Sequence, residues 1–122
     1  MNFKTYEPTT ARIEYGKLPK ISMYLSNNQF RFNNTAVMML KITSKSRCRF
    51  HFDNDKKVWF LEVGTTGYKV HLSQYAPIVQ SKAVVKAMQE MYNFSDKTVY
   101  FTPEMPKMQT DTGIFYQLTI LN

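Results

Sequence analysis

The chain has little of what small secreted proteins and membrane proteins depend on. Its 122 residues include one cysteine, so no disulfide can form within the chain. The longest aliphatic run, residues 36–40, is far shorter than the roughly 20 residues that a membrane-spanning helix needs. Residues 1–8 contain no apolar stretch of the kind found in secretory signals. These absences predict a cytoplasmic protein in a reducing setting, without membrane insertion.

Glycine and proline are also scarce, with four and five residues, and no segment is of low complexity. Hydrophobic residues make up 43% of the chain and aromatic residues 15%, which argues against disorder. A chain of this length supplies one hydrophobic core rather than two. We therefore expect a single domain over residues 1–122, with residues 1–17 as a loose N-terminal arm.

Acidic residues are few in the first half of the chain. Residues 1–61 contain eleven Lys and Arg against four Asp and Glu, a net charge of +7, whereas residues 62–122 contain five of each kind. All of the excess positive charge therefore lies in the first half, and it favours a polyanionic partner.

The segment Arg47-Cys48-Arg49-Phe50-His51-Phe52-Asp53 alternates polar and apolar residues as a half-buried strand does. A period of two places Arg47, Arg49 and His51 on one face, and Cys48, Phe50 and Phe52 on the face toward a core. Cations on the outer face need water or an anionic partner. Because Cys48 and His51 point to opposite faces, they cannot act together as nucleophile and base.

The turn-forming run from Asp53 to Lys57 leads into a second apolar strand over residues 58–63, so a hairpin is expected. A loop of three residues would put Trp59 on the face of His51, and a loop of two would put Phe60 there. Either register sets one large ring among basic side chains, which suits phosphates and stackable bases.

Other alternating segments extend this pattern along the chain. Residues 20–25 predict a strand with Lys20 and Tyr24 outward, and residues 29–32 predict another with Arg31 outward. Residues 68–72 predict a strand with Lys69 and His71 opposite its apolar residues. Residues 98–101 and 113–120 are further expected strands, joined by a loop that contains Pro103 and Pro106.

Two helices are expected between these strands. A short helix over residues 35–41 follows Asn33 or Asn34 as N-cap, and a longer one follows Ser81. The longer helix has one apolar stripe, which predicts contact with a sheet and part of a homodimer interface: Val84, Val85, Met88, Met91 and Tyr92. The fold class is thus α+β, a twisted antiparallel sheet with one main amphipathic helix and one short helix.

Residues 34–38 and 81–85 resemble each other, and each opens a helix that two expected strands follow. A duplicated half would produce this pattern. Helix starts also resemble one another for purely physical reasons, so both explanations stay open.

The strand, short helix and strand expected within residues 28–63 contain the segments Gln29-Phe30-Arg31-Phe32, Ala36-Val37, Leu40-Lys41-Ile42 and Arg47-Cys48-Arg49-Phe50. In the order and spacing of these segments, the chain resembles the AbrB-like transition-state regulators. That family forms interlocked dimers on duplex DNA. Its glycine-containing turn is replaced here by residues 41–46, which contain no glycine. Residues 19–92 are similar in pattern to the Whirly and positive-cofactor-four fold. This second resemblance implies single-stranded DNA binding by a curved basic and aromatic sheet, with dimerisation through a helix.

Motifs for catalysis are weak or missing. No phosphate-binding Gly-x-x-x-x-Gly-Lys loop occurs, and a calcium loop that began at Asp53 would have Gly64 in place of its bidentate glutamate. We expect no enzyme activity, no cofactor and no metal. The sequence predicts a DNA-binding protein, with single-stranded DNA favoured and transcription regulation as its setting, that uses Lys20, Tyr24, Arg31, Arg47, Arg49, His51, Trp59 and Lys69. The alternatives are an AbrB-like regulator on duplex DNA, and a structural or adaptor protein, viral in one version, whose basic face meets an acidic protein.

Overall fold

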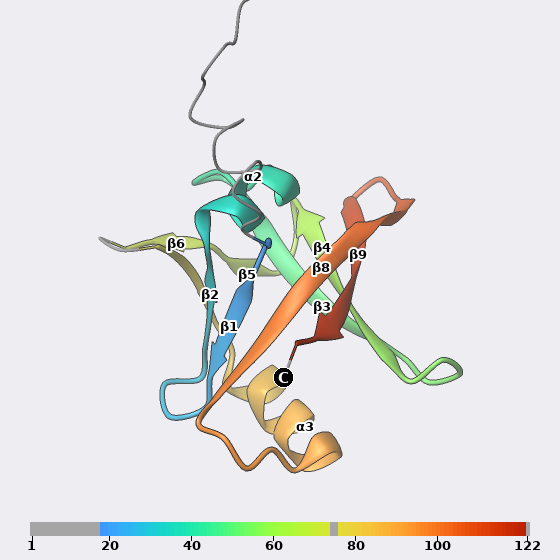
Figure 1. Ribbon diagram of the computed structural model, residues 1–122. Coiled ribbons are helices and arrows are strands. Elements are labelled where there is room, and N and C mark those ends of the chain that lie inside the picture. The colour runs from blue at the N-terminus through green and yellow to red at the C-terminus, as the bar shows by residue number, and fades with distance from the viewer. Residues whose placement is uncertain (1–17, 74–75, 122) are drawn as a thin grey trace, which may run out of the picture.

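Antiparallel strands dominate the structure, a computed structural model that describes residues 18–73 and 76–121 (Figure 1). They form one nine-stranded sheet in the order β5-β3-β4-β9-β8-β1-β2-β7-β6. The strands are β1 (Ile21–Tyr24), β2 (Gln29–Phe32), β3 (Arg47–Asp53), β4 (Val58–Gly64), β5 (Tyr68–Lys69), β6 (His71–Leu72), β7 (Pro77–Gln80), β8 (Thr98–Gln109) and β9 (Gly113–Ile120). The predicted α+β class, with one longer and one short helix on an antiparallel sheet, is confirmed.

The sheet curls until its two edge strands are neighbours in the chain. β5 at one edge and β6 at the other are separated by Val70 alone, which is 2% exposed and donates its N–H to the Ser46 carbonyl at 3.4 Å. The sheet is therefore nearly closed into a barrel (Figure 1). Residues 68–72, predicted as one strand, form both edges instead, because β5 pairs with β3 and β6 pairs with β7.

The two helices lie at opposite ends of this barrel (Figure 1). Helix α2 (Asn34–Leu40) begins after Asn33, whose side chain accepts the Ala36 N–H, and helix α3 (Lys82–Tyr92) begins after Ser81, whose side chain accepts the Val84 N–H. These N-caps satisfy amide groups that have no partner within the helix. Both helices are confirmed, with Asn33 as the cap of α2.

Inward-facing side chains from every part of the barrel make one core. Met23, Phe30, Leu61 and Phe101 are fully or almost fully buried, and the helices add Ala36, Leu40, Val85 and Met88. Burying a side chain of this size stabilises the fold by about 1.5–3 kcal/mol. The apolar residues of each strand therefore determine which of its two sides faces the core. The residues between them face outward and are free to form a site.

The strand order has an approximate twofold symmetry. Each helix follows one strand, β2 or β7, and precedes a hairpin, β3–β4 or β8–β9. The equivalent strands β2 and β7 pair with each other, as do β4 and β9. In one half, β1 lies between β2 and β8. In the other half, two short strands share the equivalent place: β6 pairs with β7, and β5 pairs with β3. This topology favours a duplicated half over a chance resemblance between the two helix starts.

The loop predicted around the two prolines is wrong, because β8 continues through both of them to Gln109. The pairing of β8 with β9 shifts register between Pro103 and Pro106 and again before Met108. Such irregularities let a strand tolerate residues that have no N–H to donate.

Strand β7 was not predicted. The predicted arm, residues 1–17, lies outside the described residues. None of the helices in the described ranges has the length and apolarity to cross a membrane.

Candidate nucleic-acid interface

The β3–β4 turn decides which aromatic ring lies beside His51. Asp53 pairs with Val58, so residues 54–57 form the loop, and Phe60 lies directly opposite His51. A loop of four residues keeps the same alternation as a loop of two. Trp59 therefore faces inward, is 8% exposed and lies 5.2 Å from the Phe52 ring. The prediction of Trp59 as a stacking platform is wrong, and Phe60 takes the outward place.

Side chains from β3 and from the loop before β9 surround one buried carboxylate, that of Glu62 on β4. Arg49 Nε lies 2.8 Å and His51 Nε2 2.9 Å from Glu62 Oε1, and the Thr112 hydroxyl donates to Oε2. The Arg49 guanidinium also donates to the Thr112 hydroxyl at 3.2 Å. Only 1% of the Glu62 side chain is exposed. We call the outward residues Arg47, Arg49, His51, Phe60, Glu62, Lys69 and Phe115 the Glu62 face.

The environment of Glu62 decides its ionisation. Burial alone would raise its pKa, but hydrogen bonds from Arg49, Thr112 and His51, with the Arg49 charge, lower the pKa from 4.5 to about 2. The same carboxylate affects the other side of the sheet. Burial, followed by the Glu62 charge, raises the pKa of the Cys48 thiol to about 12, so this cysteine is not reactive.

Arg49 finds its anionic partner within the same chain, because Glu62 supplies its counter-charge, and the same carboxylate oxygen lies within hydrogen-bonding distance of His51. This carboxylate lies opposite Arg49 in the β3–β4 register. The sequence signal was present, since Glu62 is the one charged residue in an otherwise apolar strand.

Arg47 and Lys69 keep their charges available. They lie directly opposite each other on β3 and β5, and both are exposed. Arg47 donates to the Gly67 carbonyl at 3.1 Å, and within the described part of the chain neither residue forms an ion pair. Two like charges opposite each other on paired strands are unfavourable without an anion nearby.

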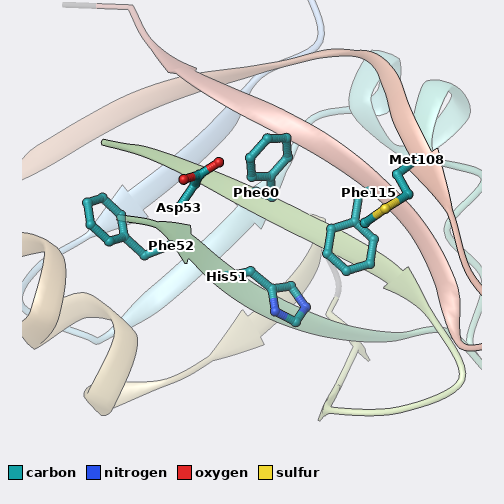
Figure 2. A pocket seen from close by; sticks show the side chains of 6 residues that line it. All are labelled: His51, Phe52, Asp53, Phe60, Met108 and Phe115. Atoms are coloured by element: carbon teal, nitrogen blue, oxygen red, sulfur yellow. The ribbon is translucent and has the colours of Figure 1, made fainter. Parts of the chain in front are cut away.

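A largely aromatic pocket lies on the same outer side, toward the other end of β3 (Figure 2). The His51 ring stacks on Phe115 with centroids 4.6 Å apart, and Phe60 lies 6.5 Å from Phe115. The cavity measures about 360 Å³ and is lined by His51, Phe52, Asp53, Phe60, Met108 and Phe115. Met108 and Phe115 were not predicted as site residues, although the alternation of residues 113–120 marks Phe115 as outward.

Lys20, Tyr24 and Arg31 belong to a different outer face. Lys20 Nζ lies 5.0 Å from the Tyr100 ring centre, and Arg31 Cζ lies 4.9 Å from that of Tyr24. Ser22 is opposite both Arg31 and Tyr100 in the register. We call Lys20, Ser22, Tyr24, Arg31 and Tyr100 the Tyr24 face. Strands β4, β9 and β8 separate β3 from β1, so the predicted residues do not gather on one extended face.

No protein-family model, curated protein or solved structure gave a match to this chain. Within residues 18–73 and 76–121, no three His, Cys, Asp or Glu side chains are grouped so that they could hold a metal ion. The likenesses to the AbrB-like and Whirly or positive-cofactor-four proteins stay predictions.

Proposed function

We propose that the protein binds nucleic acid, with single-stranded DNA favoured, through the Glu62 face and without catalysing a reaction. The observation that carries this proposal is that Arg47 on β3 and Lys69 on β5, neither of which forms an ion pair with another described residue, share the outer side of the sheet with an aromatic pocket. Lys and Arg hold phosphates, and exposed aromatic residues stack on bases. Single strands are favoured because their bases are accessible for stacking.

The spacing along β3 supports one continuous path. Arg47 and His51 are four residues apart, which is roughly 13 Å in a strand at about 3.3 Å per residue. A nucleotide strand whose phosphates meet Arg47 and Lys69 can therefore reach the pocket with a nearby base. Arg49 contributes less, because Glu62 already neutralises part of its charge. His51 contributes its ring, stacked on Phe115.

The Tyr24 face has a supporting role in this proposal. Lys20 and Arg31 would meet phosphates of a separate stretch of the strand, beyond the Glu62 face. A homodimer through α3, in the cytoplasm, remains part of the proposal. Its contact would use Met91, which is 44% exposed, and the half-buried Val84, because Val85 and Met88 are covered by the chain's own core.

The test compares two double variants of equal charge change by fluorescence anisotropy on single-stranded DNA, duplex DNA and RNA. Arg47→Ala with Lys69→Ala should weaken binding to single-stranded DNA and reduce its log–log salt slope by about 1.4, at roughly 0.7 for each lost contact. Lys82→Ala with Lys86→Ala removes two exposed cations from α3 and should leave most of that slope in place.

Equal losses in both double variants would mean that only the overall charge matters, which rules out the Glu62 face as the interface. Absence of binding to any of the three nucleic acids would reject the proposed function and leave the adaptor with an acidic protein partner as the better explanation.

A further inference from the structure

The pocket of the Glu62 face contains one group that phosphate binding does not explain. Asp53 supplies the one carboxylate among the described side chains that line this pocket. In the view of Figure 2 its carboxylate lies between the labelled side chains of Phe52 and Phe60, over the C-terminal end of β3. A carboxylate repels phosphates, so its place beside the proposed strand path calls for a ligand group that donates hydrogen bonds.

The two oxygens of Asp53 have different roles. Oδ1 accepts the N–H groups of Asp55 at 2.9 Å and of Lys56 at 3.1 Å, which fixes the loop. No hydrogen bond within the described residues occupies Oδ2. Because Asp53 is half-buried and lines the pocket together with phenylalanine side chains, its ionised carboxylate is a strong acceptor for a donor that enters the pocket.

The other walls define the shape of the ligand. Phe60, Phe115 and Met108 offer apolar and aromatic surface, and the His51 nitrogen nearest to Glu62 is already engaged. A cavity of about 360 Å³ lies at the small end of ligand pockets, as suits a single flat ring system. A base stacked there would turn one edge toward Asp53.

We infer that this pocket selects a base whose edge carries an amino group, with Asp53 Oδ2 accepting one of its N–H groups. The inference rests on the proposed function. Cytosine donates through its N4 amino group, and Asp is a known type of acceptor for it. Uracil and thymine present a carbonyl oxygen at that position, which a carboxylate repels. The strand path therefore has a base preference at one position.

Short deoxycytidine and deoxyuridine oligomers of equal length test this preference, since the two bases differ at the amino and carbonyl position and its neighbouring nitrogen. Fluorescence anisotropy at slightly alkaline pH, where cytosine is uncharged, should show about tenfold tighter binding of deoxycytidine, the size of one charge-assisted hydrogen bond. Oligomers of N4,N4-dimethyldeoxycytidine, which have no N4 donor, should bind as weakly as deoxyuridine. This comparison requires no variant.

Asp53→Asn provides the matching change in the protein. Its side-chain oxygen still accepts the Asp55 and Lys56 N–H groups, while an amide donor replaces Oδ2, so the preference should vanish or reverse toward deoxyuridine. Asp55→Asn removes the same charge from an exposed position outside the pocket. It should strengthen binding of both oligomers equally and keep their ratio.

Equal binding of deoxycytidine and deoxyuridine by the unmodified protein would overturn the inference and leave the proposed function intact. A tenfold ratio that Asp53→Asn does not alter would also overturn it, because another group would then read the base. If neither oligomer binds, the proposed function fails first. If the Asp53→Asn variant does not fold, the comparison of deoxycytidine with its N4,N4-dimethyl derivative on the unmodified protein still tests whether the N4 amino group is recognised.

Discussion

The Glu62 face and the Tyr24 face hold their basic residues in different ways. On the Glu62 face, Arg49 and His51 are bound to a buried carboxylate. On the Tyr24 face, Lys20 and Arg31 lie over tyrosine rings. A carboxylate cancels a positive charge, whereas an aromatic ring attracts a cation and leaves its charge in place. The number of cations on a face therefore does not by itself give its positive potential.

The two arrangements also differ in what they contribute to the fold. The Glu62 network links β3, β4 and the loop before β9, because Arg49, Glu62 and Thr112 come from these three segments. Close approach of the backbones there depends on Gly64, where a Cβ would come within 1.7 Å of the Thr112 carbonyl oxygen. The cation–ring pairs join only neighbouring strands. The Glu62 face should therefore matter more for stability.

Glu62→Gln should produce the largest change, because it removes the shared counter-charge and keeps the shape of the side chain. Relative to a neutral group, the ionised Glu62 contributes about 3 kcal/mol, from its pKa lowered from 4.5 to about 2. We expect a loss of that size in the free energy of unfolding in urea. DNA binding should change in the opposite direction, with a salt slope steeper by up to about 0.7, because Arg49 becomes available.

Glu90→Gln is the matched control, since it makes the same charge change at an exposed position on α3. It should change stability by less than about 0.5 kcal/mol. If Glu62→Gln were as mild as this control, the carboxylate would not be the anchor of its face, and the contrast between the two faces would disappear.

A second prediction uses pH in place of a substitution. Because the folded-state pKa of Glu62 lies below its unfolded value, the unfolded chain takes up a proton first as the pH falls. The stabilisation is complete above about pH 4.5 and is lost as the pH approaches 2. Between pH 6 and pH 3 the free energy of unfolding of the unmodified protein should fall by about 2 kcal/mol more than that of Glu62→Gln. Parallel pH profiles of the two proteins would contradict the assignment.

The fold was predictable wherever alternation and capping residues mark an element, and the site only in part. The strand pattern of residues 47–53 gives the correct inward and outward sides, and Ser81 gives the correct start of α3. The hairpin register was not predictable, because loop length depends on how Asp53 accepts the loop amides. The partners of Arg49 depend on sheet order, which brings Thr112 from the other end of the chain.

The smallest predicted effect belongs to the Tyr24 face. Tyr24→Leu keeps an apolar side chain at this position but removes the ring beneath Arg31, which at a partly exposed site should cost about 0.5–1 kcal/mol in unfolding free energy. Arg31→Met alone and together with Tyr24→Leu completes a double-mutant cycle. A coupling energy of similar size would assign the loss to this pair.

The salt dependence of DNA binding then separates the two faces. Tyr24→Leu alters how Arg31 is held but not its charge, so the salt slope should stay constant within error, whereas Glu62→Gln steepens it. A steeper slope in Tyr24→Leu would mean that the tyrosine ring had been masking the Arg31 charge as the carboxylate masks that of Arg49. The two faces would then hold their cations in the same way. If the ring leaves the Arg31 charge available to DNA, removing the ring cannot make any further charge available.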